Sequence, residues 1–69
     1  MTAFRVEVTG TFRDLALSTE EACTQVFVVA APGPVAAQVA GVQLFGGEAA
    51  RRRCVVVPGP AARILADGE

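Results

Sequence analysis

Two Pro-Gly-Pro segments, at residues 32–34 and 58–60, divide this chain into blocks with nearly the same layout. Each segment follows a valine-rich run and leads into an Ala-Ala pair or a Val-Ala-Ala run. Proline cannot donate a hydrogen bond to a neighbouring strand, but it is well tolerated in the first turn of a helix. Both blocks therefore predict a buried strand, a sharp turn and the start of a helix.

The length and composition of the chain limit the size of its core. Its 69 residues are 52% hydrophobic and only 19% charged, and this length predicts one domain over residues 1–69, with 67–69 as a frayed tail. A domain of this size buries only about 60% of the surface of its unfolded chain. Either the core is densely packed or part of the apolar surface faces another chain, and we favour the second.

Residues 4–9 alternate between apolar and polar side chains, which is typical of a strand with one buried face. Two continuations fit the residues that follow. Gly10-Thr11 suits a two-residue hairpin turn with residues 12–17 as a returning strand, but this pairing sets Glu7 opposite Asp14, and facing like charges are unfavourable. The alternative is a bulge at Gly10 within one long bent strand.

Residues 18–21, Ser-Thr-Glu-Glu, match the capping box of a helix N-terminus. The motif is short and common. It fits a single helical turn and an exposed connection equally well.

Residues 26–31 are apolar throughout, which favours a central strand covered on both faces. Pro32 ends this strand, and Pro34 suits the start of a helix. We expect that helix over residues 35–45, because Gly46-Gly47 offers the left-handed backbone geometry that ends helices.

The expected helix 35–45 carries no charged residue. On a helical projection Val35, Val39 and Val42 share one face, with Phe45 at its flank, and the opposite side carries Leu44, Ala37 and Ala40. A surface helix normally has a charged outer face, so we expect a partner to cover this one; the alternative is that its small alanines face water. The predicted partner-binding surface consists of Ala37, Ala40, Leu44 and Phe45.

The remaining segments complete the predicted fold. A charged connection over 48–53 leads to a strand at 54–57, and residues 61–66 are expected to form a last helical turn. The chain is therefore predicted to be α+β: a small sheet of three or four strands, antiparallel or mixed, with helix 35–45 packed on one face. In an alternative topology, strands 26–31 and 54–57 are parallel neighbours joined by the helix.

Groups that could carry out catalysis are scarce. The chain has no histidine, lysine or tyrosine, and Ser18 is its only serine, so a nucleophile would lack a base and an orienting group. Glu20 and Glu21 are adjacent and would point in different directions on a helix. We therefore expect a non-enzymatic protein with no catalytic residues, no cofactor and no small-molecule substrate.

The cysteines and the N-terminus bear on the expected compartment. Cys23 and Cys54 are interpreted as reduced, buried apolar side chains, since a disulfide needs an oxidising compartment and a zinc site needs two more ligands. Residues 1–15 lack the apolar core of a secretory signal, and no run approaches the roughly 18 apolar residues of a membrane span. The sequence predicts a cytoplasmic protein with no metal site and no membrane contact.

Arg51, Arg52 and Arg53 form the one conspicuous cluster of charge. Arginine binds phosphates and carboxylates in bidentate fashion, so the cluster is a candidate contact for nucleic acid or for an acidic protein. The net charge of −1 and the lack of a neighbouring aromatic platform argue against nucleic acid. The bland interpretation is a solvated segment that keeps strand 54–57 from pairing with other chains.

The leading hypothesis is a small interaction or assembly module that forms a homo-oligomer or docks on another protein through its apolar helix or sheet surface. The alternative is an accessory nucleic-acid-binding protein that uses Arg51 to Arg53.

Overall fold

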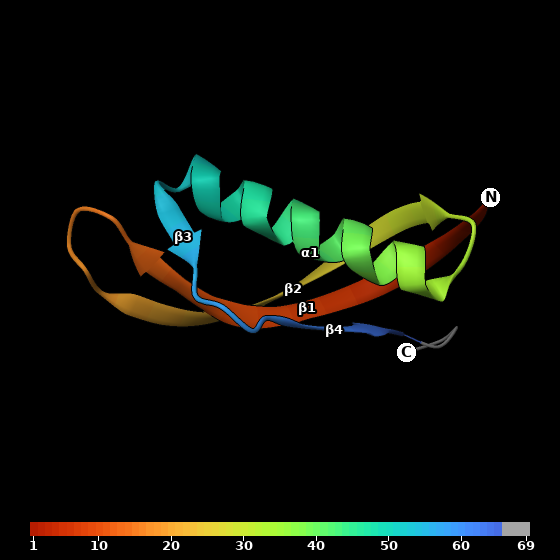
Figure 1. Cartoon of the computed structure of the whole chain (residues 1–69), viewed down its shortest axis with the longest axis horizontal. Helices are drawn as coiled ribbons and strands as arrows, with labels where there is room; N and C mark the ends of the chain where they lie inside the picture. Colours follow the sequence, from red (N-terminus) through yellow and green to blue (C-terminus); the bar gives the residue numbers. More distant parts are fainter. Residues whose placement is uncertain (66–69) are drawn as a thin grey trace.

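The computed structural model describes residues 1–65, which form a four-stranded, antiparallel sheet with one helix lying along one of its faces (Figure 1). In chain order the elements are β1 (Thr2–Asp14), β2 (Glu20–Ala31), α1 (Pro34–Arg51), β3 (Cys54–Val56) and β4 (Ala61–Ile64). The predicted α+β class, the sheet and the single main helix are confirmed. The predicted tail at 67–69 lies outside the described residues.

Strand β1 is the centre of the sheet. It pairs with β2 along one side, from Thr2 opposite Ala31 to Arg13 opposite Glu20. On its other side it pairs with β3 and then with β4, so that β2 and β3 lie on opposite sides of β1. The alternative topology, in which strands 26–31 and 54–57 are parallel neighbours, is therefore wrong.

Residues 2–14 form one long strand, without a hairpin at Gly10. This glycine has a packing role instead, because a Cβ atom there would lie 2.8 Å from Cε2 of Phe45 and 3.2 Å from Cβ of Pro60. The ring of Phe45 thus rests directly on the backbone of β1. Of the two continuations, the single long strand is the one adopted, but the predicted bulge at Gly10 is wrong, because the pairing with β2 runs unbroken through Gly10 and Cys23.

The turn between β1 and β2 lies at residues 15–19, and not at Gly10-Thr11 as in the hairpin alternative. Oδ1 of Asp14 accepts hydrogen bonds from the backbone N–H groups of Ala16 and Leu17, at 2.8 and 2.9 Å. Ser18 sits in the left-handed region with φ of 56°, and β2 begins two residues on. The capping-box segment is therefore an exposed connection, because an aspartate turn satisfies its backbone and strand pairing resumes at Glu20.

Helix α1 is longer than predicted, because it continues through Gly46-Gly47 to Arg51. Each glycine costs roughly 1 kcal/mol in a helix interior. The burial of Phe45 and Ala49 against the sheet offsets that cost. The first four residues of the predicted connection 48–53, residues 48–51, are accordingly the last turn of the helix.

The face that α1 turns to the sheet also differs from the expectation. Its buried residues follow each other at every fourth position: Ala37, Gly41, Phe45 and Ala49. Val35 and Val39, predicted to be on the inner face, are 72% and 54% exposed. Small residues take the inner face because the helix lies very close to β1: a Cβ atom on Gly41 would be 2.7 Å from Cγ1 of Val6.

The core lies between α1 and the helix-facing side of β1 and β2. The rings of Phe12 and Phe45 stack with their centroids 4.7 Å apart, and Val6 and Val8 are completely buried beside them. Each such side chain contributes about 1.5–3 kcal/mol on burial. The described hydrophobic residues with full burial are Val6, Val8, Phe12, Val29, Ala31, Ala37, Phe45 and Ala49.

Strands β3 and β4 form one interrupted edge along β1. Two residues of β1 lie between its pairings with β3 and β4, from Phe12–Val56 to Thr9–Ala61. The segment that joins β3 to β4 has four residues over the same interval, residues 57–60. The second Pro-Gly-Pro therefore forms a bulge in this edge, with Gly59 at φ of 97°. It leads into a strand, so the prediction of a helical turn at 61–66 is wrong within its described part.

The reason is that β1 offers these residues a ready set of hydrogen bonds. The N–H of Val57 donates to the carbonyl of Thr11 at 2.9 Å, and the N–H of Leu65 donates to that of Arg5 at 2.8 Å. A six-residue helix would be too short to be stable in isolation.

Candidate interaction surface at the free edge of strand β2

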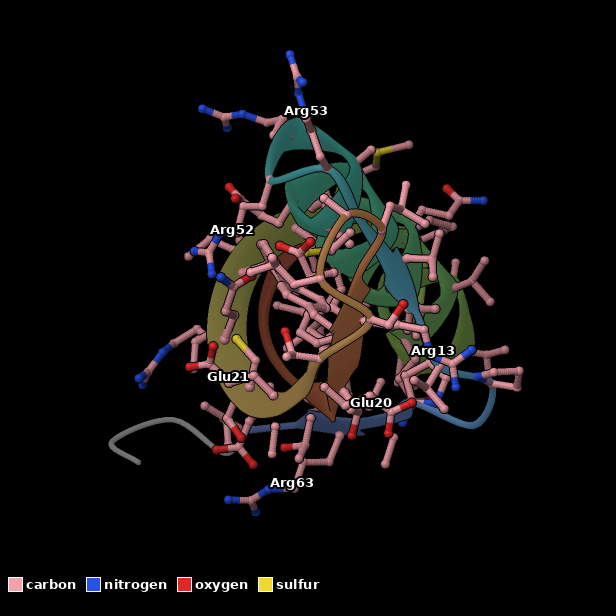
Figure 2. All side chains as sticks on the ribbon, turned by 90° about the vertical axis from the view of Figure 1, so that its left-hand side faces the viewer. Arg13, Glu20, Glu21, Arg52, Arg53 and Arg63 are labelled. Carbon is pink, nitrogen blue, oxygen red and sulfur yellow. The ribbon has the colours of Figure 1, made fainter. Side chains whose placement is uncertain are left out.

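Strand β2 leaves one side of its backbone open. Within residues 1–65 it pairs with β1 alone, and it forms the olive strand on the left of Figure 2. It is 12 residues long and contains no proline, lysine or arginine. Proteins usually protect such edges with prolines, charges or bulges, and β2 carries charge only at Glu20 and Glu21.

The hydrogen bonds of β1 show which residues of β2 have free backbone groups. The carbonyl of Arg5 points towards β4, where it accepts from Leu65. The backbone N–H and C=O groups of alternate residues in a strand point to opposite neighbouring strands. The N–H and C=O groups of the even-numbered residues of β1 therefore point towards β2. These pair with odd-numbered residues of β2, as Val8 does with Gln25. The N–H and C=O groups that face outwards therefore belong to Glu20, Ala22, Thr24, Val26, Val28 and Ala30.

The helix-facing side chains of β2 are only partly covered. Cys23, Gln25 and Phe27 are all half-buried. Oε1 of Gln25 is shielded from solvent yet has no hydrogen-bond partner among the described residues. A shielded polar atom without a partner is costly, at about 1–3 kcal/mol.

A groove runs between β2 and the flank of α1 that overhangs it. Phe27, Gln43, Leu44 and Gly47 line it, and Glu48 and Arg51 close one end. Leu44 is 47% exposed there. The free edge, the half-buried row and this groove together form the surface that we call the β2 edge surface.

The four residues predicted to bind a partner do not lie together. Ala37 and Phe45 are fully buried in the core of the chain itself and cannot contact a partner. Leu44 lies in the groove of the β2 edge surface, and Ala40, half-buried, lies one helical turn before it on the same flank. The sequence-based projection misplaced the first pair because it assigned the inner face to the larger valines.

Sequence reasoning also missed the edge itself. The run 26–31 was predicted to be covered on both faces, but Val26 and Val28 are 48% and 73% exposed. Residues 1–65 provide no second layer over that face. In so short a chain, a strand that is apolar on both faces is a signal that one of these faces will remain exposed.

The outer face of the sheet is largely satisfied by pairs within the chain. Arg13 and Glu20 form an ion pair of 2.6 Å across β1 and β2 (Figure 2), and the hydroxyl groups of Thr9 and Thr24 are 3.0 Å apart. Cross-strand pairs of this kind are typical of a solvated sheet face. This face therefore offers a partner less than the β2 edge does.

The three arginines at the end of α1 do not form one basic patch. Glu48 lies 3.3 Å from Arg51 and 4.0 Å from Arg52, and Arg52 also lies 5.7 Å from the centre of the Phe12 ring. Arg53 adopts a positive φ of 56° and its side chain extends away from the body of the molecule (Figure 2). One carboxylate thus offsets part of the charge that sequence reasoning assigned to the cluster.

Other kinds of site find little support in residues 1–65. No group of three or more metal-ligating side chains is present in this range, and no helix within it is long and apolar enough to cross a membrane. Cys23 and Cys54 are free thiols on opposite sides of β1, both half-buried. The chain matches no family model, and comparison with curated proteins and with solved structures gave no match.

Proposed function

We propose that this chain is a non-enzymatic protein-interaction module that binds a polypeptide strand along the β2 edge surface. The observation that supports this proposal is the row of outward-facing backbone groups on six alternate residues of an almost uncharged strand. Strand addition to such an edge is a recurring mode of protein recognition, in which backbone hydrogen bonds supply affinity and side-chain contacts supply specificity.

The size of the surface supports the same proposal. The molecule measures 40 × 19 × 17 Å, and β2 runs along its length. A strand of 12 residues extends over about 40 Å, so a bound strand could pair with β2 along most of the length of the molecule.

The side chains of this surface favour binding over catalysis. They are aliphatic, aromatic, hydroxyl or amide groups, apart from the thiol of Cys23, the glutamates at the start of β2 and the pair Glu48–Arg51, and no histidine or lysine is present to activate the thiol. Nucleic-acid binding by Arg51, Arg52 and Arg53 is the alternative function. It draws less support, because Glu48 lies within 4.0 Å of two of these arginines.

The test compares two lysine variants of equal exposure. Val28 lies on the free edge and Leu17 lies in the β1–β2 turn, and both are 73% exposed. A lysine on an edge strand opposes pairing with another strand. We expect the wild-type protein and Leu17→Lys to self-associate at micromolar to millimolar concentration in sedimentation velocity, and Val28→Lys to remain monomeric.

A Val28→Lys variant that associates as the wild type does would contradict the proposal. A wild-type protein that remains monomeric across the whole concentration range would exclude a second copy as the bound strand. Binding of DNA or RNA that weakens steeply with salt and is lost on replacing all three clustered arginines would favour the alternative.

A further inference from the structure

We infer that the occupant of the β2 edge is a second copy of this chain, bound antiparallel about a two-fold axis that passes between the two Gln25 residues. This inference rests on the proposed function and specifies its partner and register. The two sheets would then join into one, with both copies of α1 on the same face.

Backbone complementarity supports this register. When Gln25 faces its own copy, Glu20 faces Ala30, Ala22 faces Val28, and Thr24 faces Val26 of the second chain. All six residues whose N–H and C=O groups point outwards then meet one another, and each facing pair exchanges two hydrogen bonds. No outward-facing group of β2 between the ends of the pairing remains open.

The half-buried row on the helix side is complementary to itself in the same register. Cys23 of one copy faces Phe27 of the other, so a small side chain meets a large one, and Gln25 faces Gln25. These positions are non-hydrogen-bonded pairs, in which the side chains lie closest together. The two Gln25 side chains meet at the axis, where their amide groups can hydrogen-bond to each other, while the shielded Oε1 lies within each chain.

The charges of β2 select the antiparallel orientation. Glu20 and Glu21 are its only charged residues and both lie at its start. A parallel pair would set each glutamate beside its own copy, which is unfavourable. The antiparallel pair places them at opposite ends of the join, beside the uncharged residues Val29 and Ala30 of the other chain.

The flank of α1 favours a copy over an unrelated strand. The two-fold axis brings the groove of each copy to the same join, with Leu44 of each helix and Phe27 of each strand facing it. A lone peptide strand would leave Leu44 uncovered above the edge. A second copy supplies a helix as well as a strand.

Cysteine cross-linking tests the register. In a background with Cys23→Ala and Cys54→Ala, Gln25→Cys should form an intermolecular disulfide on mild oxidation, because facing residues at such a position have Cα atoms about 4.5 Å apart. Val28→Cys is the control: it is more exposed than Gln25, but in this register it lies six strand positions from its copy, about 20 Å. We expect at least a tenfold faster dimer formation for the first variant.

Each result is informative, provided that sedimentation is measured on the same variants before oxidation. A dimer in which Val28→Cys or Val26→Cys cross-links faster than Gln25→Cys overturns the inference but leaves the proposed function standing. The same holds for a dimer that Val28→Lys dissociates but that none of these cysteines links. Absence of any self-association overturns the inference, and the strand that the proposed function requires would then belong to another protein. If Gln25→Cys does not fold, as judged by circular dichroism, an intermolecular contact between Gln25 side-chain amides in isotope-filtered NMR of the wild type supports the inference, and its absence overturns it.

Discussion

Replacing Gly41 with alanine tests how closely helix α1 approaches strand β1. Gly41 is buried in the middle of the helix, and its new methyl group would lie 2.7 Å from Cγ1 and 3.2 Å from Cβ of Val6. Ordinary carbon–carbon contacts are about 3.5–4.0 Å. Val6 is completely buried and β-branched, so it has little freedom to move aside. The helix must therefore retreat from the sheet.

The expected magnitude follows from two opposing effects. Alanine gains about 1 kcal/mol over glycine in a helix interior, while overpacking of a core costs about 1–3 kcal/mol. Gly46→Ala is the matched control, because a Cβ atom there meets nothing within 4 Å. It should show the gain alone, about 1 kcal/mol. Gly41→Ala should thus be less stable than Gly46→Ala by about 1–3 kcal/mol.

Urea denaturation followed by circular dichroism measures this difference. Both variants are best compared in the Val28→Lys background, so that self-association does not add to the apparent stability. The control should melt about 4–8 °C above its parent. Equal stabilisation by alanine at both positions would show that the close approach of α1 at Gly41 is not real.

Three further predictions concern the core, a backbone turn and the surface. Phe45→Ala should lower the free energy of unfolding by about 3–5 kcal/mol. Leu44 is half exposed at the neighbouring position, so Leu44→Ala should lower it by less than about 1 kcal/mol. Similar losses for the two variants in urea denaturation would contradict the assigned helix face. Arg53→Gly should raise the free energy of unfolding by about 0.5–1 kcal/mol, because Arg53 has a φ of 56° just after the helix, and Arg53→Ala, which keeps the strained backbone, should show no such gain in thermal melts. A double-mutant cycle on Arg13→Gln and Glu20→Gln should give a coupling energy of about 0.2–1 kcal/mol. That coupling should shrink in molar salt, and a larger coupling that is insensitive to salt would refute the assignment of an exposed pair.

The parts of the fold that depend on local periodicity could be predicted from the sequence. The alternation of residues 4–9 places Phe4, Val6 and Val8 on one side, and the structure packs all three against the core. The two Pro-Gly-Pro segments mark real interruptions of the chain. These features depend on sterics and side-chain spacing within a few residues, which a single sequence contains.

The face and length of the helix could not be predicted in the same way. Hydrophobicity alone favours Val35 and Val39 over Gly41 for the buried face of the helix. The face that packs on the sheet is instead the one with small residues, because it permits the closest approach of α1 to β1. That choice depends on the shape of β1, where Gly10 provides room for the ring of Phe45. Intrinsic propensity predicts that Gly46-Gly47 ends the helix, and tertiary packing overrides it.

The candidate site could be predicted only in part. An apolar, uncharged surface was expected, and Ala40 and Leu44 do lie on the flank beside β2. The free edge of β2 could not be located from the sequence. The apolar pattern of a strand indicates that its side chains are buried, but it does not indicate which strands will pair with it. The unpartnered Oε1 of Gln25 depends on tertiary positions alone.

The two sides of the sheet differ in a way that bears on how far assembly can proceed. The side formed by β3 and β4 is broken by Pro58-Gly59-Pro60 into pieces of three and four residues, too short and kinked to template another strand. A subunit with two adhesive sides would recruit neighbours without end and grow into fibrils. With its second side blunted, the sheet has one long open edge, so the assembly that we propose would stop once a pair has formed.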